Sequence, residues 1–348
     1  MIFRILKIFD DCDLVILNLS NYGSSKGKIV GAKMLSVGIV MRTKNRSVLF
    51  KRALLSVANQ TYSNWQLVVV NDGGATTEVD RLVEEVMGNH RDKCRVIHNA
   101  DSVGMEAASN SGLAILDTHL AVIHDDDDSW LAEFLHTMVT AYQDAKVISP
   151  TVGGIVCHVN TVYETVEGNT ITINQISDFN QWQKEGFLSL IEMLKGNFVP
   201  TIGFVFELDL CKQIGCFDAS LPVLGDWDFN LRYLLKKDVW LISKTLAHYH
   251  HRVHSTGDVG NSIYFGREKH KNYRKFIENK YIREDVRLNQ IGLGHMCLTT
   301  NLAQDSGRQI FLSLRKLRQH TKYKIIRFFV FGNLKKRYKA KLVELERG

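Results

Sequence analysis

Four adjacent carboxylates, Asp125, Asp126, Asp127 and Asp128, follow the apolar run 120–123 after a single histidine, His124. Like charges at the end of a strand repel one another and resist desolvation unless a cation or hydrogen-bond donors compensate them. A hard divalent ion, Mg²⁺ or Mn²⁺, prefers oxygen ligands and would leave coordination positions for a diphosphate. The alternatives are a solvated acidic loop and a helix N-terminus capped by Asp128.

A second polar turn, Asn71-Asp72-Gly73-Gly74, closes the short apolar run 66–70. An aspartate in such a turn can accept a hydrogen bond from the N–H of a nucleobase. It can equally bond its own backbone in a plain turn, and the residues alone leave both interpretations open.

A third acidic segment, Gly225-Asp226-Trp227-Asp228, comes about 100 residues after the aspartate run. A carboxylate beside an aromatic ring could act as a general base toward a sugar hydroxyl while the ring stacks on the sugar. An aspartate-rich first helical turn with a buried Trp227 is the alternative.

Four histidines lie within seven positions, and one of them could bind a metal ion. They are His248, His250, His251 and His254. At least two are expected to be ordinary loop residues.

Short apolar runs alternate with helical patterns in the first part of the chain. The runs cover 35–40, 66–70, 95–98 and 120–123, and the helical patterns cover 49–58, 79–86 and 106–116. This alternation predicts an α/β protein with a doubly wound, mostly parallel sheet and helices on both faces. Ligands bind such sheets beyond the carboxyl ends of the strands. The polar clusters at 42–46, 71–74 and 124–128 follow three of the predicted strands.

The alternation changes after Trp130. The patterns there predict a β-ribbon over 152–176, a helix over 187–194, a strand over 201–206 and a helix over 226–235, with a weak helical signal over 260–300.

Composition and missing motifs exclude several classes of protein. With 45% hydrophobic and 23% charged residues the chain is neither collagen-like nor wholly disordered. No G-x-G-x-x-G follows the first strand, and no Walker A, H-E-x-x-H or G-x-S-x-G motif occurs. The six scattered cysteines indicate reduced thiols, and no signal peptide or membrane-spanning run is visible, so we expect a cytoplasmic protein.

The positive charge is concentrated in one segment. The whole chain carries +7, whereas residues 308–348 hold 13 Lys and Arg against two Glu. A basic segment with interleaved aromatics predicts peripheral contact with an anionic membrane, on its inner face. A packed helix is the second interpretation, and nucleic-acid binding is the least favoured.

Seven segments, taken in order, resemble the inverting family 2 glycosyltransferases of the GT-A fold. The resemblance covers Leu35 to Ser262. The segments are 40–46 (P-T-Y-N-R in the family), 56–65 (S-x-x-x-Q-T-Y-x-x-W), 71–74 (D-D-G-S), 104–112 (G-x-x-x-A-R-N-x-G), 125–127 (D-x-D), 225–228 (E-D-W-D) and 250–254 (R-x-H or H-H-R).

The resemblance implies a role for each matching residue. Asp226 would be the catalytic base, and Asp127 would bind a divalent metal, Mn²⁺ or Mg²⁺, with His254 or alternatively His250. Trp227 and Asp228 would contact the acceptor. The residues implied in donor binding are Thr43, Asn45, Arg46, Asp72, Gly104, Asn110, Asp125 and Asp126.

Three positions depart from the family pattern. Asn71 replaces the first acid of D-D-G-S, and Gly225 replaces the glutamate of E-D-W-D. Ser109 stands where an arginine is common, so the positive charge for a diphosphate must come from elsewhere.

The expected activity is transfer of a sugar from a nucleotide-diphospho-sugar, with a UDP-sugar favoured, to a glycan or lipid-linked acceptor in the assembly of bacterial-type surface polysaccharides. A sugar nucleotidyltransferase and a catalytically silent nucleotide-sugar-binding module are the alternatives. The expected organisation is an N-terminal extension or linker (1–33), a GT-A domain (34–262), a helical extension (263–307) and a basic amphipathic tail (308–348).

Overall fold

The computed structural model describes residues 34–252, 260 and 267–304. The chain divides into Met1–Met34 and Leu35–Gly348, and the description that follows concerns the second unit. The predictions for the N-terminal extension, for His254 and for the basic tail lie outside the described residues.

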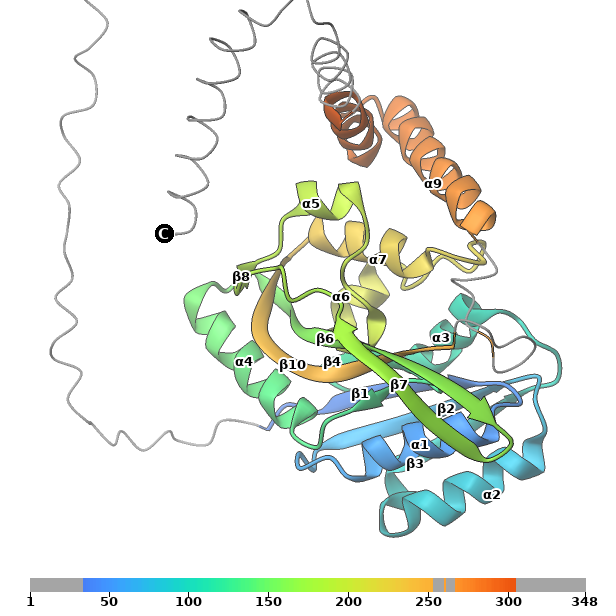
Figure 1. Cartoon of the computed structure of the whole chain (residues 1–348). Coiled ribbons are helices and arrows are strands. Elements are labelled where there is room, and N and C mark those ends of the chain that lie inside the picture. The colour runs from blue at the N-terminus through green and yellow to red at the C-terminus, as the bar shows by residue number, and fades with distance from the viewer. Residues whose placement is uncertain (1–33, 253–259, 261–266, 305–348) are drawn as a thin grey trace, which may run out of the picture. The chain divides into compact units, whose positions relative to one another are not determined.

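The first part of the domain is the predicted alternation of strands and helices (Figure 1). Its elements are β1 (Val37–Thr43), α1 (Ser47–Ala58), β2 (Trp65–Asp72), α2 (Thr76–Met87), η2 (Gly88–Lys93), β3 (Cys94–Asn99), α3 (Met105–Ala114) and β4 (Leu120–Asp125).

The second part contains longer strands. Its elements are β5 (Ser129–Trp130), α4 (Phe134–Ile148), β6 (Val152–Glu167), β7 (Thr170–Asp178), β8 (Gly186–Phe187), α5 (Leu190–Lys195), η3 (Thr201–Gly203), β9 (Phe204–Glu207), α6 (Leu208–Gln213), α7 (Gly225–Leu234), β10 (Asp238–His251) and α9 (Arg267–Leu288). Residues 293–304 are also helical. The β-ribbon is confirmed as β6 and β7, whereas no sequence pattern indicated β10.

The ten strands of the described residues form one sheet in the order β3-β2-β1-β4-β9-β6-β10-β5, with β7 beside β6 and β8 beside β10. Strands β3, β2, β1 and β4 are parallel, as are β6 and β10, while β9 is antiparallel to both of its neighbours. The predicted α/β class with a mostly parallel sheet is thus confirmed.

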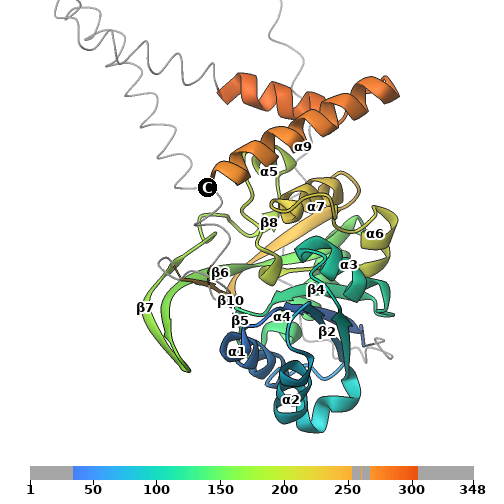
Figure 2. The same ribbon diagram turned by 90° about the vertical axis from the view of Figure 1, so that its right-hand side faces the viewer.

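Alternating strand residues pack against two separate layers of helices (Figure 2). Ile39 and Leu67 face a core shared with α1, α2 and α4, whereas Val40 and Val68 face a core shared with α3, α5, α6 and α7. Successive side chains of a strand point to opposite faces, so a strand buried on both faces is apolar throughout. This burial is why the first strands appear as unbroken apolar runs.

Within residues 34–252 and 267–304, no helix has the length and apolar character needed to cross a bilayer.

Candidate active site

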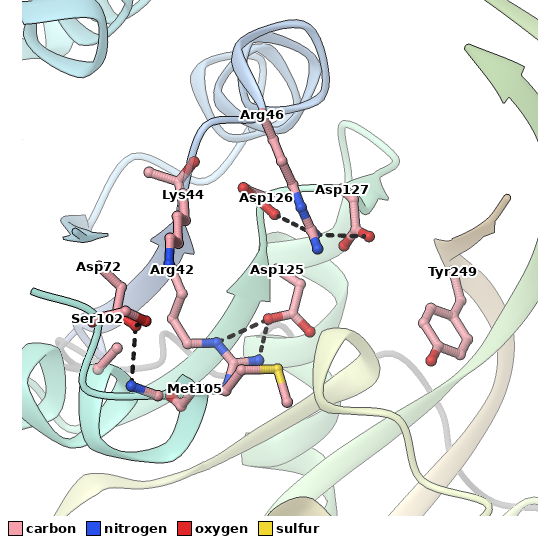
Figure 3. A pocket seen from close by; sticks show the side chains of 13 residues that line it. Arg42, Lys44, Arg46, Asp72, Ser102, Met105, Asp125, Asp126, Asp127 and Tyr249 are labelled. Atoms are coloured by element: carbon pink, nitrogen blue, oxygen red, sulfur yellow. Dashed lines mark hydrogen bonds and ion pairs between the residues drawn. The ribbon is translucent and has the colours of Figure 1, made fainter. Parts of the chain in front are cut away.

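The carboxyl ends of β1, β2 and β4 meet at one edge of the sheet. Arg42 of β1 lies directly across from Asp125 of β4, and Thr43 lies across from Asn71 of β2. This register brings the three predicted polar clusters around a cavity of about 320 Å³ (Figure 3). The cavity is lined by Arg42, Thr43, Lys44, Arg46, Asp72, Ser102, Gly104, Met105, Ala108, Asp125, Asp126, Asp127 and Tyr249.

Guanidinium groups face the aspartate run. Arg42 Nε donates to Asp125 Oδ1 at 3.0 Å. Arg46 contacts Asp126 Oδ1 at 3.1 Å and Asp127 Oδ2 at 3.3 Å. Arg252, whose side chain is fully buried, also pairs with Asp127. Part of the compensation expected for the repelling carboxylates therefore comes from arginines within the chain.

Burial disfavours the charged form of two of the aspartates, Asp126 and Asp128. Burial raises the pKa of Asp126 to about 6, against the opposing charge of Arg46. Burial also raises the pKa of Asp128 well above its usual value, and this residue accepts a hydrogen bond from the His250 backbone N–H at 2.9 Å. The capping role considered for Asp128 is wrong, because the following residues form β5 and the next helix begins at Phe134.

The residues that could hold a divalent ion are Asp126 and Asp127. The Oδ2 atom of Asp126 is buried and has no hydrogen-bond partner, and carboxylate oxygens are the ligands that Mg²⁺ and Mn²⁺ prefer. An oxygen of this kind fits a bound cation. In the described part of the chain, no group of three or more His, Cys, Asp or Glu side chains is arranged around a metal position.

His250 does not fit the predicted alternative role of metal ligand. Its Nδ1 pairs with Glu164 at 2.7 Å and its Nε2 with the Ser129 hydroxyl at 2.8 Å. Both ring nitrogens are therefore already engaged, and the ring is buried.

Glu164 on β6 is buried and is the shared partner of several basic side chains near the aspartate run, an arrangement called the Glu164 hub here. Its carboxylate accepts from Arg52 at 2.6 Å and from Arg252 at 2.7 Å. Burial opposes the charge, but hydrogen bonds from His250 and Arg52 outweigh it and lower the pKa of Glu164 to about 2. The hub fixes Arg252 against Asp127.

Asp72 lines the cavity but already has a full set of donors. It accepts from the Asn99 amide and the Val103 N–H at 2.9 Å, from the Ser102 hydroxyl at 2.7 Å and from the Gly104 N–H at 3.1 Å. Burial opposes the charge, and these hydrogen bonds outweigh it and lower the pKa of Asp72. A nucleobase N–H would have to share one of these oxygens.

Two residues expected to contact the donor are absent from the cavity lining. Asn45 has a positive φ of 54° and accepts from the Ala75 N–H at 3.2 Å. Asn110 exchanges two hydrogen bonds with the backbone of Phe217, at 2.8 and 3.0 Å. Both side chains hold loops in place, so the prediction of direct donor contacts is not supported by their positions.

Asp226 lies in the first turn of α7 and is half-buried. Its carboxylate accepts from the Asn197 amide at 2.6 Å and from the Trp227 N–H at 2.8 Å. Burial raises its pKa, and the nearby charge of Asp125 raises it further. A raised pKa makes a carboxylate a better proton acceptor near neutral pH.

The positions of Trp227 and Asp228 are contrary to the predicted acceptor contact. Trp227 is 2% exposed and its indole N–H donates to the Met193 carbonyl at 2.7 Å. Asp228 is fully buried and bonds Arg232 at 2.8 Å and Tyr281 at 2.7 Å. The burial of Trp227 was considered as an alternative, and it is what the structure has.

Several residues at the site were not predicted to belong to it. Arg42, Glu106 and Arg252 lie in the segments 40–46, 104–112 and 250–254, which carry the family resemblance, although it implied no role for these three residues. Glu164, Asn197 and Tyr249 came without a sequence signal, because their partners lie far along the chain.

Comparison with known proteins agrees with this geometry. Residues 38–193 match the family described as Glycosyl transferase family 2. The chain is 26% identical over 183 residues to "Uncharacterized glycosyltransferase alr2836" of Nostoc sp. PCC 7120, covering 52% of this chain and 53% of that protein. It is 26% identical over 104 residues to an Escherichia coli protein, "UDP-Glc:alpha-D-GlcNAc-diphosphoundecaprenol beta-1,3-glucosyltransferase WfgD", covering 30% of this chain and 40% of that protein.

A solved structure with a similar fold is TarS 1-349 of S. aureus in complex with UDP-GlcNAc. It superposes with a TM-score of 0.51 at 18% identity, covering 64% of this chain and 60% of that one. The TarS structure thus shares the α/β fold of this chain, and residues 38–193 match the family model. The chain spans about half the length of the Nostoc relative.

Proposed function

We propose that the chain is an inverting glycosyltransferase that moves a sugar from a nucleotide-diphospho-sugar to an acceptor hydroxyl. One observation carries this proposal: cations and carboxylates from three strand ends line one cavity within a family 2 domain. A diphosphate needs cations, and a nucleoside needs a polar wall such as the one around Asp72.

A UDP-sugar is the favoured donor. UDP-GlcNAc is the ligand of the TarS structure, and the name of WfgD states a UDP-Glc donor and a diphosphoundecaprenol-linked acceptor. A glycan or lipid-linked acceptor in surface polysaccharide assembly fits the same relatives.

In the proposed reaction the Asp226 carboxylate takes the proton of the acceptor hydroxyl as that oxygen bonds to the anomeric carbon. The bond from the anomeric carbon to the diphosphate oxygen breaks, and its electron pair leaves with UDP. Configuration at the anomeric carbon inverts in this single displacement. Asn197 orients Asp226, and Arg42, Lys44 and Arg46 face the developing charge on the leaving group.

Asp126 and Asp127 would hold a divalent ion, Mg²⁺ or Mn²⁺. Such an ion, when bound, stabilises the negative charge of a leaving diphosphate. The buried Asp126 Oδ2 atom supports this assignment.

The test is release of UDP from UDP-glucose and UDP-GlcNAc by the full chain, with Mn²⁺ or with a chelator. Release of UDP that stops with the chelator and in Asp127→Ala supports the proposal. Consumption of UTP with release of pyrophosphate would instead identify a nucleotidyltransferase. Binding of the UDP-sugar without turnover, under any metal condition and with glycan acceptors present, would identify a silent binding module.

Peripheral membrane contact is a separate part of the proposal. It is supported by the sequence of residues 308–348, where 13 Lys and Arg are interleaved with aromatics. The full chain is expected to sediment with anionic but not neutral liposomes, and the chain lacking 308–348 with neither. A full chain that stays in the supernatant would refute it.

A further inference from the structure

The side chain of Glu106 lies directly against Gly225, beside the cavity. A Cβ atom on residue 225 would lie 2.3 Å from Glu106 Oε1 and 2.4 Å from its Cδ. Real Cβ atoms do not approach other atoms so closely, so the carboxyl of Glu106 fills the space into which a side chain at residue 225 would project. Glu106 comes from the first turn of α3, and Gly225 begins α7.

The Glu106 carboxyl has a defined partner in Arg42. Glu106 is 6% exposed, and its Oε2 atom lies 3.7 Å from an Arg42 guanidinium nitrogen. The same guanidinium donates to the Met105 carbonyl at 3.1 Å and to the Asp125 carboxylate. Arg42 is therefore held from α3 on one side and from β4 on the other.

This fixed guanidinium faces the cavity (Figure 3). Hydrogen bonds to Asp125 and Met105 engage three of its five N–H groups, which leaves donors for a phosphate. Ser109, by contrast, is fully buried and its hydroxyl donates to the Met105 carbonyl at 3.0 Å, so it brings no charge to this wall.

We propose that Glu106 is a positioning residue that, with Gly225, fixes the Arg42 guanidinium to receive the donor's diphosphate. The carboxylate that the family pattern E-D-W-D has at the position of Gly225 comes in this chain from α3, and the cation that the pattern has at the position of Ser109 comes from β1. An arginine ordered before the ligand arrives loses less side-chain entropy on binding. The inference rests on the proposed function, because it assumes that a nucleoside diphosphate enters this cavity.

The test is calorimetric binding of UDP to the full chain in the presence of Mg²⁺ at about pH 8.5, where Glu106 is ionised. Arg42→Gln is expected to lower the affinity about tenfold or more, because charge-assisted hydrogen bonds to phosphate are strong. Glu106→Ala is expected to lower it about threefold to tenfold, since Arg42 then keeps only the partners Asp125 and Met105.

A relocated carboxylate separates positioning from packing. In Glu106→Ala/Gly225→Asp, the new carboxylate lies near the place that the old one occupied, and UDP affinity is expected to return to within about twofold of wild type. Glu106→Ala/Gly225→Asn has the same size without the charge and is expected to stay as weak as Glu106→Ala. Equal rescue by aspartate and asparagine, or no rescue by aspartate, would overturn the proposal.

Controls separate this inference from the proposed function. Arg81→Gln removes an exposed arginine of α2 that pairs with Glu78 and Glu85, and it should leave UDP binding unchanged. Wild-type binding of UDP together with wild-type affinity in Arg42→Gln would overturn the inference alone. A wild-type chain that binds no UDP would overturn both. Melting curves of every variant show that the protein measured is folded.

Discussion

Helix α7 contributes one aspartate to each of two clusters of charged side chains, and the two clusters differ in how their carboxylates are compensated by neighbouring cations. The cavity cluster contains Asp125, Asp126 and Asp127, which line the cavity, and two acids outside the lining, Glu106 and Asp226, that interact electrostatically with Asp125. The junction cluster contains Asp218, Asp228, Arg232 and Lys280, at the contact of α7 with α9. Asp226 and Asp228 are two residues apart, so a helix directs them to different sides.

The pKa shifts of the two clusters have opposite directions. In the cavity cluster, burial raises the pKa of Asp126 to about 6 and that of Glu106 to about 7, and it also raises the pKa of Asp226. In the junction cluster, burial of Asp218 is outweighed by the hydrogen bond from Lys280, and its pKa falls to about 2. Carboxyl groups with a raised pKa indicate a site that is stabilised by binding a ligand or a proton. The junction cluster is complete without one and stabilises the fold.

The largest expected effect is on stability, in Asp228→Ala. This change removes the buried carboxylate that pairs with Arg232 and Lys280, and Lys280 keeps only Asp218 as an ion-pair partner. Breaking such a buried pair costs about 3 kcal/mol of unfolding free energy. Urea unfolding measures the loss, and UDP affinity at 25 °C is expected to stay within about threefold. Wild-type stability together with lost turnover would instead support the acceptor contact that the sequence predicted for Asp228.

The next effect is on activity, in Asp127→Asn. Asparagine can still accept a hydrogen bond from Arg252, so the melting temperature should change little. The substitution removes the negative charge that would hold a divalent ion beside the leaving diphosphate. UDP release from the donor is expected to fall about a hundredfold or more, equivalent to about 2.7 kcal/mol. Unchanged release in a folded variant would remove Asp127 from the site.

A smaller effect concerns pH and Glu106→Gln. A folded-state pKa of about 7, against a usual 4.5, means that the folded state binds this proton more tightly than the unfolded state. The contribution of Glu106 to stability is therefore fully present below pH 4.5 and is lost as pH rises through 7. Between pH 5 and 7 the loss is on the order of 2 kcal/mol.

The measurement for Glu106 is the difference in unfolding free energy between wild type and Glu106→Gln across that pH range. The variant should lack this fall, because glutamine does not titrate. Parallel pH profiles for the two proteins would show that Glu106 does not bind a proton in this window.

The sequence was sufficient for the elements whose pattern is local. The apolar runs and helical spacings up to residue 125 predicted β1 to β4. Strands β1, β2 and β4 are buried on both faces, and the edge strand β3 is partly buried. It was insufficient for β10, whose polar and aromatic residues do not form the apolar pattern expected of a strand. This strand pairs with β6 through several register shifts. The histidines there appeared to be a loop cluster, although His250 belongs to this strand.

The site was predictable to the extent that its residues follow predicted strands. Asp125, Asp126, Asp127 and Asp72 do so, and they line the cavity. The ion pair of Arg42 with Glu106 and the contact of Glu106 with Gly225 join residues 64 and 119 positions apart, and they depend on how α3 and α7 pack. No local pattern encodes that packing. For the same reason the sequence could not tell Asp226 from Asp228.

The most direct test of the account compares UDP binding and UDP-sugar turnover in Asp226→Asn. Asparagine keeps the size of the side chain but cannot take a proton from the acceptor, and a general base contributes a hundredfold or more to the rate. The account predicts UDP affinity within about threefold of wild type and turnover lowered at least about a hundredfold. Asp144→Asn, on the exposed face of α4, is the matched control and should behave as wild type. Wild-type turnover in Asp226→Asn would contradict the account.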